Sequence, residues 1–569
     1  KFFNQSKLNY AENCLKKDDN SDAIIFYNEQ ENCRRYSWKE LKQKVFQLSH
    51  YFVSKKIKPG DRIAAVLPNI PETVISFLST SQIGAIWSSC SSDFGPKAII
   101  DRFKQIEPKV LIVTDYYFYN NKKINTLSNL KKITKAIPSI QEIIIIPYSN
   151  DKLKNNYTNW NKIFENNSQF TKFLNLPFNH PLYILYSSGT TGVPKCIVHG
   201  AGGSLIQHLK EHQLHLNIQE NDKVFYFTTC GWMMWNWLIS VLASKATIIL
   251  YDGSPFVPNI DYLFNISEKE NINFFGTGAK YIDHLKLNNI NIKKNYSLKN
   301  LNTIASTGSP LVNESFNYVY NNIKSDVHLA SISGGTDIVS CFVIGNRMQP
   351  VFSGEIQCAG LGMDVDVFDE NGNSLNGEKG ELVCKSPFPS QPLGFWNDIN
   401  KEKYKKAYFL KYQNIWHHGD FIKKTKNNGY IILGRSDTTL NAGGIRIGTA
   451  EIYRIVENIK NIGECVAVEY KLKTDTQVIL FITLLNELIL NENIISNIKL
   501  EIKQNLSPKH VPAKIYQVSD IPKTKSGKIT ELIIKNIING EKNNNLSTLS
   551  NPDCLKDYEK IYVGLNSNK

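Results

Sequence analysis

The residues best suited to chemistry lie in one ten-residue run, YSSGTTGVPK, at residues 186–195. Its glycines let the backbone approach a ligand closely, and N–H and hydroxyl groups can then converge on phosphate oxygens. Lys195 adds positive charge. The run is not a Walker A loop, because Val-Pro-Lys-Cys follows the second glycine. It holds more glycine and hydroxyl than an ordinary turn needs, so we predict a phosphate-binding loop formed by Ser187, Ser188, Gly189, Thr190, Thr191, Gly192 and Lys195.

Three further motifs place charged side chains beside glycine: HHGD at 417–420, GRSDTTLNAGGIR at 434–446 and PKTKSGK at 522–528. A carboxylate at a strand end, as we expect for Asp420, can accept hydrogen bonds from both hydroxyls of a ribose. A lysine on a glycine-preceded loop, such as Lys528, can reach a site on another domain and neutralise charge that develops on a phosphoryl group or carboxylate. Each motif alone would also suit a surface turn.

In this order, the motifs resemble those of the adenylate-forming superfamily, which contains acyl-CoA synthetases, peptide adenylation domains and luciferases. The family pattern also includes an aromatic-rich turn ending in Thr-Glu. Here the matching run is SGGTD at 333–337, with Asp337 where most members have glutamate. Either carboxylate can hold Mg²⁺, but aspartate is shorter and would need a water bridge or a shifted backbone.

The resemblance implies a role for each motif. The phosphate-binding loop contacts ATP, Asp337 is the metal ligand, Lys528 is catalytic, and Asp437 is the hinge of a small mobile domain. The implied adenine, ribose and AMP contacts are Gly308, Ser309, Pro310, Thr336, Asp420, Arg435 and Arg446. The implied CoA contacts are Gly443 and Gly444, with Lys503 and Lys509 as candidates for its phosphates.

The predicted acyl pocket lies beside Gly334. Relatives that use acetate carry tryptophan at this position, so glycine predicts room for a longer acid, and we expect Gly334→Trp to shift preference toward acetate. Filling an apolar pocket discriminates between two acids by only about 1–3 kcal/mol for each methylene by which they differ. We predict that Trp232 and Met233, in the run GWMMWNW at 231–237, form the other wall of the pocket, although such a run would equally suit a plain core.

Longer runs resemble the acetate-ligase-like branch that acts on the four-carbon 3-oxo acid acetoacetate; they span residues 231–255, 331–346, 354–372, 387–398 and 440–454. Members of that branch usually begin further upstream. The resemblance implies an ATP-dependent ligase that joins acetoacetate to CoA through an acyl-adenylate, with ATP, CoA and Mg²⁺ as its small-molecule requirements. A related short-chain acyl-CoA synthetase, acting on propionate, butyrate or acetate, is the alternative.

The elements that must position these motifs follow an alternating pattern. Short apolar runs, such as 62–67, predict strands, and amphipathic stretches, such as 38–55, 72–84 and 492–505, predict helices. This alternation predicts parallel sheets covered on both faces. Beyond residue 350 the pattern favours a β subdomain, and beyond 435 a smaller α+β module. We therefore predict an α/β fold with a large N-terminal domain at 1–436 and a small mobile C-terminal domain at 437–569.

Composition excludes several other classes of protein. The 569 residues are 42% hydrophobic, which is enough for a large core. The net charge of +14 could serve nucleic acid, a membrane surface or anionic small molecules. Basic residues are scattered and no nucleic-acid-binding signature occurs, so we expect small anions and no nucleic acid. We expect no membrane insertion. Ten cysteines without a C-x-x-C pair predict buried, reduced thiols in the cytoplasm.

Overall fold

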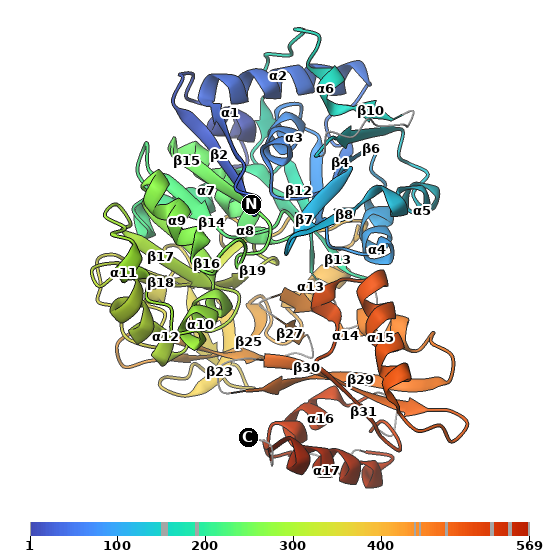
Figure 1. Ribbon diagram of the computed structural model, residues 1–569. Coiled ribbons are helices and arrows are strands. Elements are labelled where there is room, and N and C mark those ends of the chain that lie inside the picture. Colours follow the sequence, from blue (N-terminus) through green and yellow to red (C-terminus); the bar gives the residue numbers. More distant parts are fainter. Residues whose placement is uncertain are drawn as a thin grey trace. The chain divides into compact units, whose positions relative to one another are not determined.

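The computed structural model describes residues 2–148, 157–187, 193–436, 440–442, 445–472, 476–523, 529–543 and 549–566 (Figure 1). Its contacts divide the chain into two compact units. The first consists of Lys1–Ser92, Arg102–Tyr186 and Cys196–Gly434; the second consists of Asp93–Asp101, Ser187–Lys195 and Arg435–Lys569. This division assigns two segments of the predicted N-terminal domain to the second unit. The domain boundary after residue 436 stays a prediction.

An eight-stranded sheet has the order β10-β9-β6-β4-β5-β12-β13-β24. Strands from β10 to β12 run parallel, whereas β24 pairs antiparallel with β13. Parallel strands are covered on both faces, which accounts for the apolar sequence of β4. The strands are β4 (Arg62–Leu67), β5 (Ile86–Ser91), β6 (Val110–Thr114), β9 (Glu142–Ile146), β10 (Thr158–Asn159), β12 (Pro181–Ser187), β13 (Lys195–Gly200) and β24 (Gly394–Phe395).

A seven-stranded sheet has the order β18-β17-β16-β14-β15-β2-β3, and only the pair β2–β3 is antiparallel. Alternate residues of β15 face different cores: Ile248 and Leu250 belong to a cluster shared with the eight-stranded sheet, and Ile249 to a cluster under helices α9 (Tyr262–Glu270) and α10 (Ala279–Leu287). The strands are β2 (Asp22–Asn28), β3 (Cys33–Ser37), β14 (Lys223–Tyr226), β15 (Thr247–Asp252), β16 (Phe274–Gly278), β17 (Thr303–Thr307) and β18 (His328–Ser331).

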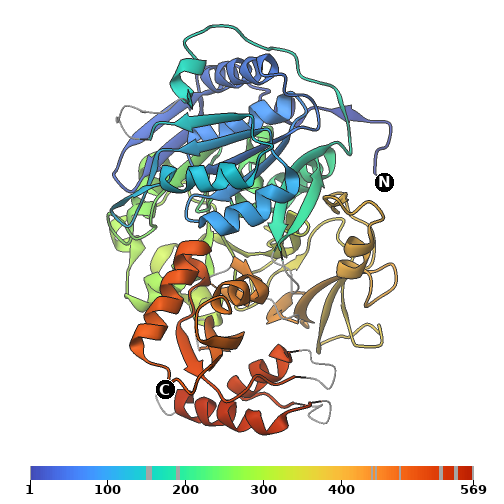
Figure 2. The ribbon, with the colours of Figure 1, turned by 90° about the vertical axis from the view of Figure 1, so that its right-hand side faces the viewer.

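Helices cover these sheets (Figure 2). Helix α2 begins with a capping box, in which Ser37 and Glu40 each bind the other's backbone N–H. The α-helices up to residue 434 are α1 (Tyr10–Cys14), α2 (Trp38–Ser54), α3 (Pro71–Gln82), α4 (Pro96–Ile106), α5 (Leu130–Ala136), α6 (Trp160–Ile163), α7 (Ala201–Leu209), α8 (Met233–Ile239), α9 (Tyr262–Glu270), α10 (Ala279–Leu287), α11 (Ile292–Asn295), α12 (Asn313–Tyr318) and α13 (Glu402–Tyr408).

The predicted β subdomain is a four-stranded sheet in the order β22-β23-β25-β26, with its own apolar core. Its strands are β22 (Val365–Phe368), β23 (Lys379–Cys384), β25 (Trp416–Lys424) and β26 (Tyr430–Arg435). Short strands complete the first unit: β1 (Lys7–Leu8), β7 (Tyr116–Tyr119), β8 (Lys122–Asn125), β11 (Leu176–Pro177), β19 (Ser333–Gly335), β20 (Ser340–Ile344) and β21 (Cys358–Ala359).

The second unit is built on the three-stranded sheet β29-β30-β31. Side chains of its strands alternate between two clusters, one shared with α14 and α15 and the other with α16 and α17, so helices cover both faces (Figure 1). The elements are β27 (Leu440–Ala442), β28 (Ile445–Ile447), α14 (Thr449–Val456), β29 (Ile462–Lys471), β30 (Thr476–Leu484), α15 (Glu492–Asn505), β31 (Lys514–Gln517), α16 (Glu531–Ile538) and α17 (Leu555–Asn566).

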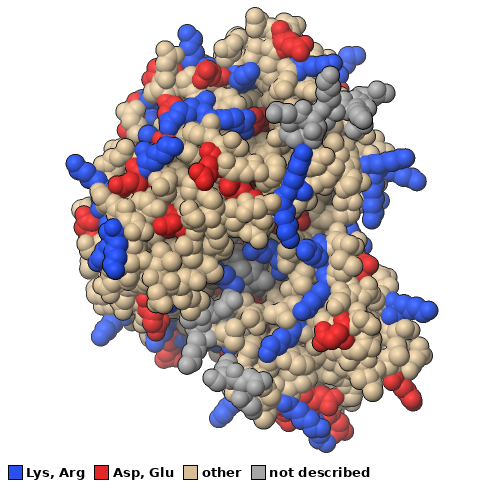
Figure 3. Space-filling view, in the orientation of Figure 1, with Lys and Arg blue, Asp and Glu red and all other residues tan. Residues whose placement is uncertain are grey.

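The predicted fold class is confirmed: parallel α/β sheets, a β subdomain and an α+β module are all present. No helix within the described residues is long and apolar enough to span a bilayer. On the face shown in Figure 3, lysines and arginines are spread widely and mixed with acidic residues. All ten cysteines are free thiols, and of these Cys33 is exposed, contrary to the expectation of buried thiols.

Candidate active site

The predicted phosphate-binding loop lies between two strands of the eight-stranded sheet. Strand β12 ends at Ser187, which is buried, and β13 begins at Lys195, which is half-buried. Outside the described residues lie Ser188, Gly189, Thr190, Thr191 and Gly192. Strand β12 runs parallel to β5, and its carboxyl end leads into this segment. Ligands of α/β sheets usually bind at the carboxyl ends of the strands. Its phosphate-binding role stays a prediction.

The predicted adenine contacts follow β17 at the carboxyl edge of the seven-stranded sheet. Gly308 has φ +90°, a left-handed conformation that favours glycine. Strand β18 runs parallel to β17, so the segments after both strands leave the sheet at the same edge. There Thr307 Oγ1 donates a hydrogen bond to the carbonyl oxygen of Ile332 at 2.8 Å. The fold therefore brings residues 308–310 beside the segment that leads to Thr336.

The predicted metal ligand, Asp337, follows β19 and is buried. The hydroxyl of Tyr408 in α13 donates a 2.6 Å hydrogen bond to Asp337 Oδ1. Among the described residues, no group of three or more His, Cys, Asp or Glu side chains is placed to hold a metal. Protein-bound Mg²⁺ usually takes one or two carboxylates together with substrate phosphates and water. A single carboxylate oriented by Tyr408 fits such a shared ion.

A buried histidine, His199 of β13, lies close enough to Asp337 to interact with its charge. Burial lowers the pKa of His199 from 6.5 to about 3, and the attraction of Asp337 offsets this only in part. His199 is therefore a neutral imidazole near pH 7. It can act as a hydrogen-bonding group beside the predicted metal ligand, and it adds no positive charge there.

This histidine predicts a pH-dependent stability. The unfolded chain binds a proton at His199 below about pH 6.5, whereas the folded chain does so only near pH 3. The free energy of unfolding should therefore fall as pH falls from 6.5 to 3, by up to about 1.4 kcal/mol per pH unit from this residue. Denaturant unfolding of wild type and His199→Gln across this range should give curves that converge toward low pH. Parallel curves would contradict the assigned pKa.

The predicted ribose carboxylate, Asp420, is buried in the middle of β25, not at a strand end as expected. The pairing register of β23 and β25 shifts between Glu381 and Val383, opposite this part of β25. Gly419 has φ +80° at the same place. Such a bulge redirects a side chain within a strand, which explains how a mid-strand carboxylate can face a ligand. His418 Nε2 lies 3.5 Å from Asp420 Oδ2. Arg435 is buried at the end of β26.

The tryptophan-rich run divides into core and candidate pocket residues. Trp235 and Trp237 are fully buried in the main apolar cluster, so they belong to the core. Trp232, just before α8, is half-buried, and its ring meets the edge of Tyr226 with 6.2 Å between centroids. Met233 is buried at the start of α8. Trp232 and Met233 remain the predicted acyl contacts.

The space at Gly334 differs from the expectation. In β19, Gly334 pairs with Cys341 of β20 at a register shift. A Cβ on Gly334 would lie well under 3.0 Å from the carbonyl oxygen of Ser340 and the Cα of Cys341. A side chain at this position would therefore meet rigid backbone. Gly334 permits the close approach of two strands, and its lack of a side chain does not by itself measure the room in the acyl pocket.

Comparison with known proteins agrees with this arrangement. The family described as "AMP-binding enzyme" matches residues 11–392. The chain belongs to the AMP-binding enzyme family. It is 48% identical to the acetoacetyl-coenzyme A synthetase of Rhizobium meliloti (strain 1021), covering 100% of this chain and 88% of that protein. It is 43% identical to the acetoacetyl-CoA synthetase of Xenopus tropicalis, covering 98% and 86%.

A solved structure of an AMP-binding enzyme relative is also similar. The acetoacetyl-CoA synthetase from Streptomyces lividans matches with a TM-score of 0.75 and 36% identity, covering 98% of this chain and 87% of that one. The family and branch predicted from the motifs are thus confirmed. The roles of individual site residues are not tested by these matches and stay predictions.

The segment after β26 is the predicted hinge and CoA region. Outside the described residues lie Asp437, Gly443 and Gly444, and nothing is described of the Arg446 side chain. Strands β27 and β28 pair antiparallel on either side of the glycine pair, with Asn441 opposite Arg446. Lys503 on α15 and Lys509 are exposed.

The second unit contains a cavity of about 360 Å³ that the sequence did not predict. It is lined by three cations, Lys97, Arg454 and Lys460, together with Glu501 and several asparagines. Arg454 Nη2 lies 3.2 Å from Asp101 Oδ2. Lys503 does not line this cavity. Clustered cations with amide donors suit a polyanionic ligand.

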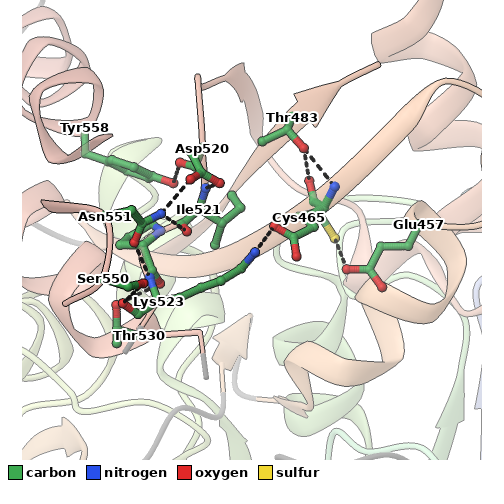
Figure 4. A network of polar contacts seen from close by, with 12 residues as sticks. Glu457, Cys465, Thr483, Asp520, Ile521, Lys523, Thr530, Ser550, Asn551 and Tyr558 are labelled. Atoms are coloured by element: carbon green, nitrogen blue, oxygen red, sulfur yellow. Dashed lines mark hydrogen bonds and ion pairs between the residues drawn. The ribbon is translucent and has the colours of Figure 1, made fainter. Parts of the chain in front are cut away.

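The predicted catalytic residue, Lys528, lies outside the described residues, but both ends of its segment are described. Lys523 and Ile529 form an antiparallel bridge. Figure 4 shows part of the polar network on this base, with Lys523 beside Asn551 and Ser550. The Lys523 N–H donates to Asn551 Oδ1 at 2.9 Å, and Lys523 Nζ pairs with Glu464 at 2.6 Å. Asn551 Nδ2 also donates to Asp520 Oδ2 at 2.7 Å. Sequence reasoning missed these supporting residues because their partners lie far away along the chain.

Proposed function

We propose that this AMP-binding enzyme is an ATP-dependent acid–thiol ligase that converts acetoacetate, ATP and CoA to acetoacetyl-CoA, AMP and pyrophosphate. The observation that carries the proposal is the 48% identity to a named acetoacetyl-coenzyme A synthetase across 100% of the chain. The placement of the predicted adenine contacts at the carboxyl edge of the seven-stranded sheet supports it. The substrates are small molecules, and the cytoplasm is the predicted location.

In the first half-reaction, a carboxylate oxygen of acetoacetate attacks the α-phosphorus of ATP. The bond to the β-phosphate oxygen breaks, and pyrophosphate leaves with the electron pair. Thr190, Thr191 and Lys195 hold the β- and γ-phosphates, and Asp420 accepts hydrogen bonds from the ribose. Lys528 stabilises the charge shared by the incoming carboxylate and the α-phosphate. Positioning and electrostatics supply most of the rate enhancement, because phosphoryl chemistry leaves little covalent work to the protein.

Asp337 would hold Mg²⁺, which supplies positive charge to phosphate oxygens when bound. The contribution of the chain itself is orientation. Tyr408 fixes one oxygen of the carboxylate, and neutral His199 adds no competing cation.

In the second half-reaction, the CoA sulfur attacks the carbonyl carbon of the mixed anhydride. AMP leaves with the electron pair, and the thiol proton passes to solvent. We propose that the small domain turns about Asp437 between the two steps, which withdraws Lys528 and presents Gly443 and Gly444 to the pantetheine arm. Arg446 contacts the phosphate of AMP.

We further propose that the cavity of the second unit takes phosphate groups of CoA. Lys97→Ala should raise the KM for CoA about fivefold, the loss of roughly 1 kcal/mol expected for one charge-assisted contact. ATP/pyrophosphate exchange, which needs no CoA, should be unchanged. Lys132→Ala, which removes an exposed lysine of α5, is the matched control. An unchanged KM for CoA in Lys97→Ala would refute this placement.

The decisive test of the function is ATP/pyrophosphate exchange and thioester formation measured over a panel of acids. We expect the highest kcat/KM with acetoacetate. Equal or better kcat/KM with butyrate, propionate or acetate would instead favour the alternative, a short-chain acyl-CoA synthetase of the same mechanism.

A further inference from the structure

An ionised side chain buried in the first unit connects two walls of the predicted acyl site. Helix α7 continues into a π-helical turn, Lys210–His215, which carries Glu211. Glu211 has 0% exposure. π-helical turns are rare and often occur at functional sites. A buried carboxylate is costly unless it is fully hydrogen-bonded or paired, so its partners indicate what it holds in place.

The first partner of Glu211 is helix α8. The indole N–H of Trp237 donates to Glu211 Oε2 at 2.9 Å. Trp237 lies four residues after Met233, one turn along the same face of α8. The hydrogen bond therefore fixes the helix face that carries a predicted acyl contact.

The second partner is strand β20. The Ser340 hydroxyl and, at 3.5 Å, the backbone N–H of Cys341 both donate to Glu211 Oε1. Ser340 and Cys341 are the residues paired with Gly335 and Gly334, just before Thr336 and Asp337. The carboxylate thus holds β20 at the place where its backbone abuts Gly334.

Neighbouring side chains support this bridge. Lys210 Nζ lies 3.6 Å from Glu211 Oε1. Burial would raise the pKa of Glu211, but Lys210, His208 and the hydrogen bond from Ser340 hold it below its usual value, so the group is ionised. His208 makes a parallel connection: its Nδ1 lies 2.7 Å from Ser240 Oγ after α8, and its Nε2 lies 2.5 Å from the Val339 carbonyl oxygen before β20.

We propose that Glu211 is a positioning residue for the acyl substrate: by binding Trp237 of α8 and Ser340 and Cys341 of β20, it sets the separation of the two elements between which the acyl group lies. This inference rests on the proposed function, because it takes Met233 and the Gly334–Asp337 segment as the acyl site. Loosening the bridge should impair the acid more than the nucleotide.

The test is Glu211→Gln, which keeps the side-chain volume but offers one acceptor oxygen where two are used. We expect the KM for acetoacetate to rise about tenfold, the KM for ATP to stay within about twofold, and the preference for acetoacetate over butyrate to fall. Glu270→Gln is the matched control. Glu270 is another buried carboxylate of this unit, bonded to Tyr27 and Arg35 on the seven-stranded sheet, and its loss should lower the melting temperature without changing either KM.

Equal rises in both KM values, or a lower melting temperature with unchanged kinetics, would overturn the inference. If the wild type instead prefers another short acid, the proposed substrate is wrong, and the variants are then measured with the preferred acid. A selective rise in the KM for that acid in Glu211→Gln would still support the positioning role of Glu211. If the KM for that acid does not rise selectively, the positioning role is refuted.

Discussion

Replacing Lys528 with alanine is expected to slow ATP/pyrophosphate exchange about 100- to 1,000-fold, the usual cost of removing one preorganised group that stabilises developing charge. Thioester formation from supplied acetoacetyl-AMP and CoA should remain near the wild-type rate, because the proposed role of this lysine ends once pyrophosphate has left. Exchange of labelled pyrophosphate into ATP measures the first half-reaction, and CoA thioester formation measures the second.

A matched control lies five residues earlier. Lys523 flanks the same segment, but its Nζ pairs with Glu464, and both side chains are partly exposed. Exposed pairs contribute little to stability, so Lys523→Ala should keep both activities within about threefold of wild type. Equal loss of both half-reactions in Lys528→Ala would contradict the assigned role.

Replacing Gly334 with tryptophan is expected to destabilise the protein and not to convert it to acetate use. The new Cβ would overlap the carbonyl oxygen of Ser340 and the Cα of Cys341, and backbone of a paired strand cannot move as a flexible side chain can. Even Gly334→Ala should cost more than about 3 kcal/mol of unfolding free energy, beyond ordinary overpacking. Thermal and urea unfolding measure the loss.

Gly564→Ala supplies the comparison. A Cβ on Gly564 in α17 would meet no atom within 4 Å, and alanine favours helix over glycine by about 1 kcal/mol, so stability should stay equal or rise. A well-folded Gly334→Trp variant with wild-type stability and a preference for acetate would show that β19 and β20 can separate. It would also support the prediction that glycine at this position makes room for a longer acid.

The local sequence correctly predicted the bounds of elements that depend only on residues within the element itself. The run RIAAVL gave the bounds of β4 correctly, and the amphipathic run at 492–505 gave those of α15, because apolar period and end signals lie within the segment. The order of the motifs likewise predicted the family. These features need no knowledge of distant contacts.

The remainder depends on partners far apart along the chain. Glu211 is one acid in the polar run KEHQLH, and only the fold brings Trp237 and Ser340 to it. Tyr408 reaches Asp337 across 71 residues. Asp420 was expected at a strand end because a bulge has no local apolar signature, and the crowding at Gly334 comes from the neighbouring strand.

The network around Lys523 has a practical consequence for anyone who dissects the second unit. The Lys523 N–H donates to Asn551 Oδ1, and the Ser550 N–H donates to the Lys523 carbonyl oxygen at 2.9 Å. Tyr558 packs into the apolar cluster on one face of β29. A recombinant fragment trimmed at residue 540 would leave these backbone groups unpaired and remove α17, one of the two helices that cover this apolar sheet face. A fragment for isolated expression should therefore extend through α17. Loss of activity in an assay can then be attributed to the substituted residue and not to a missing part of the fold.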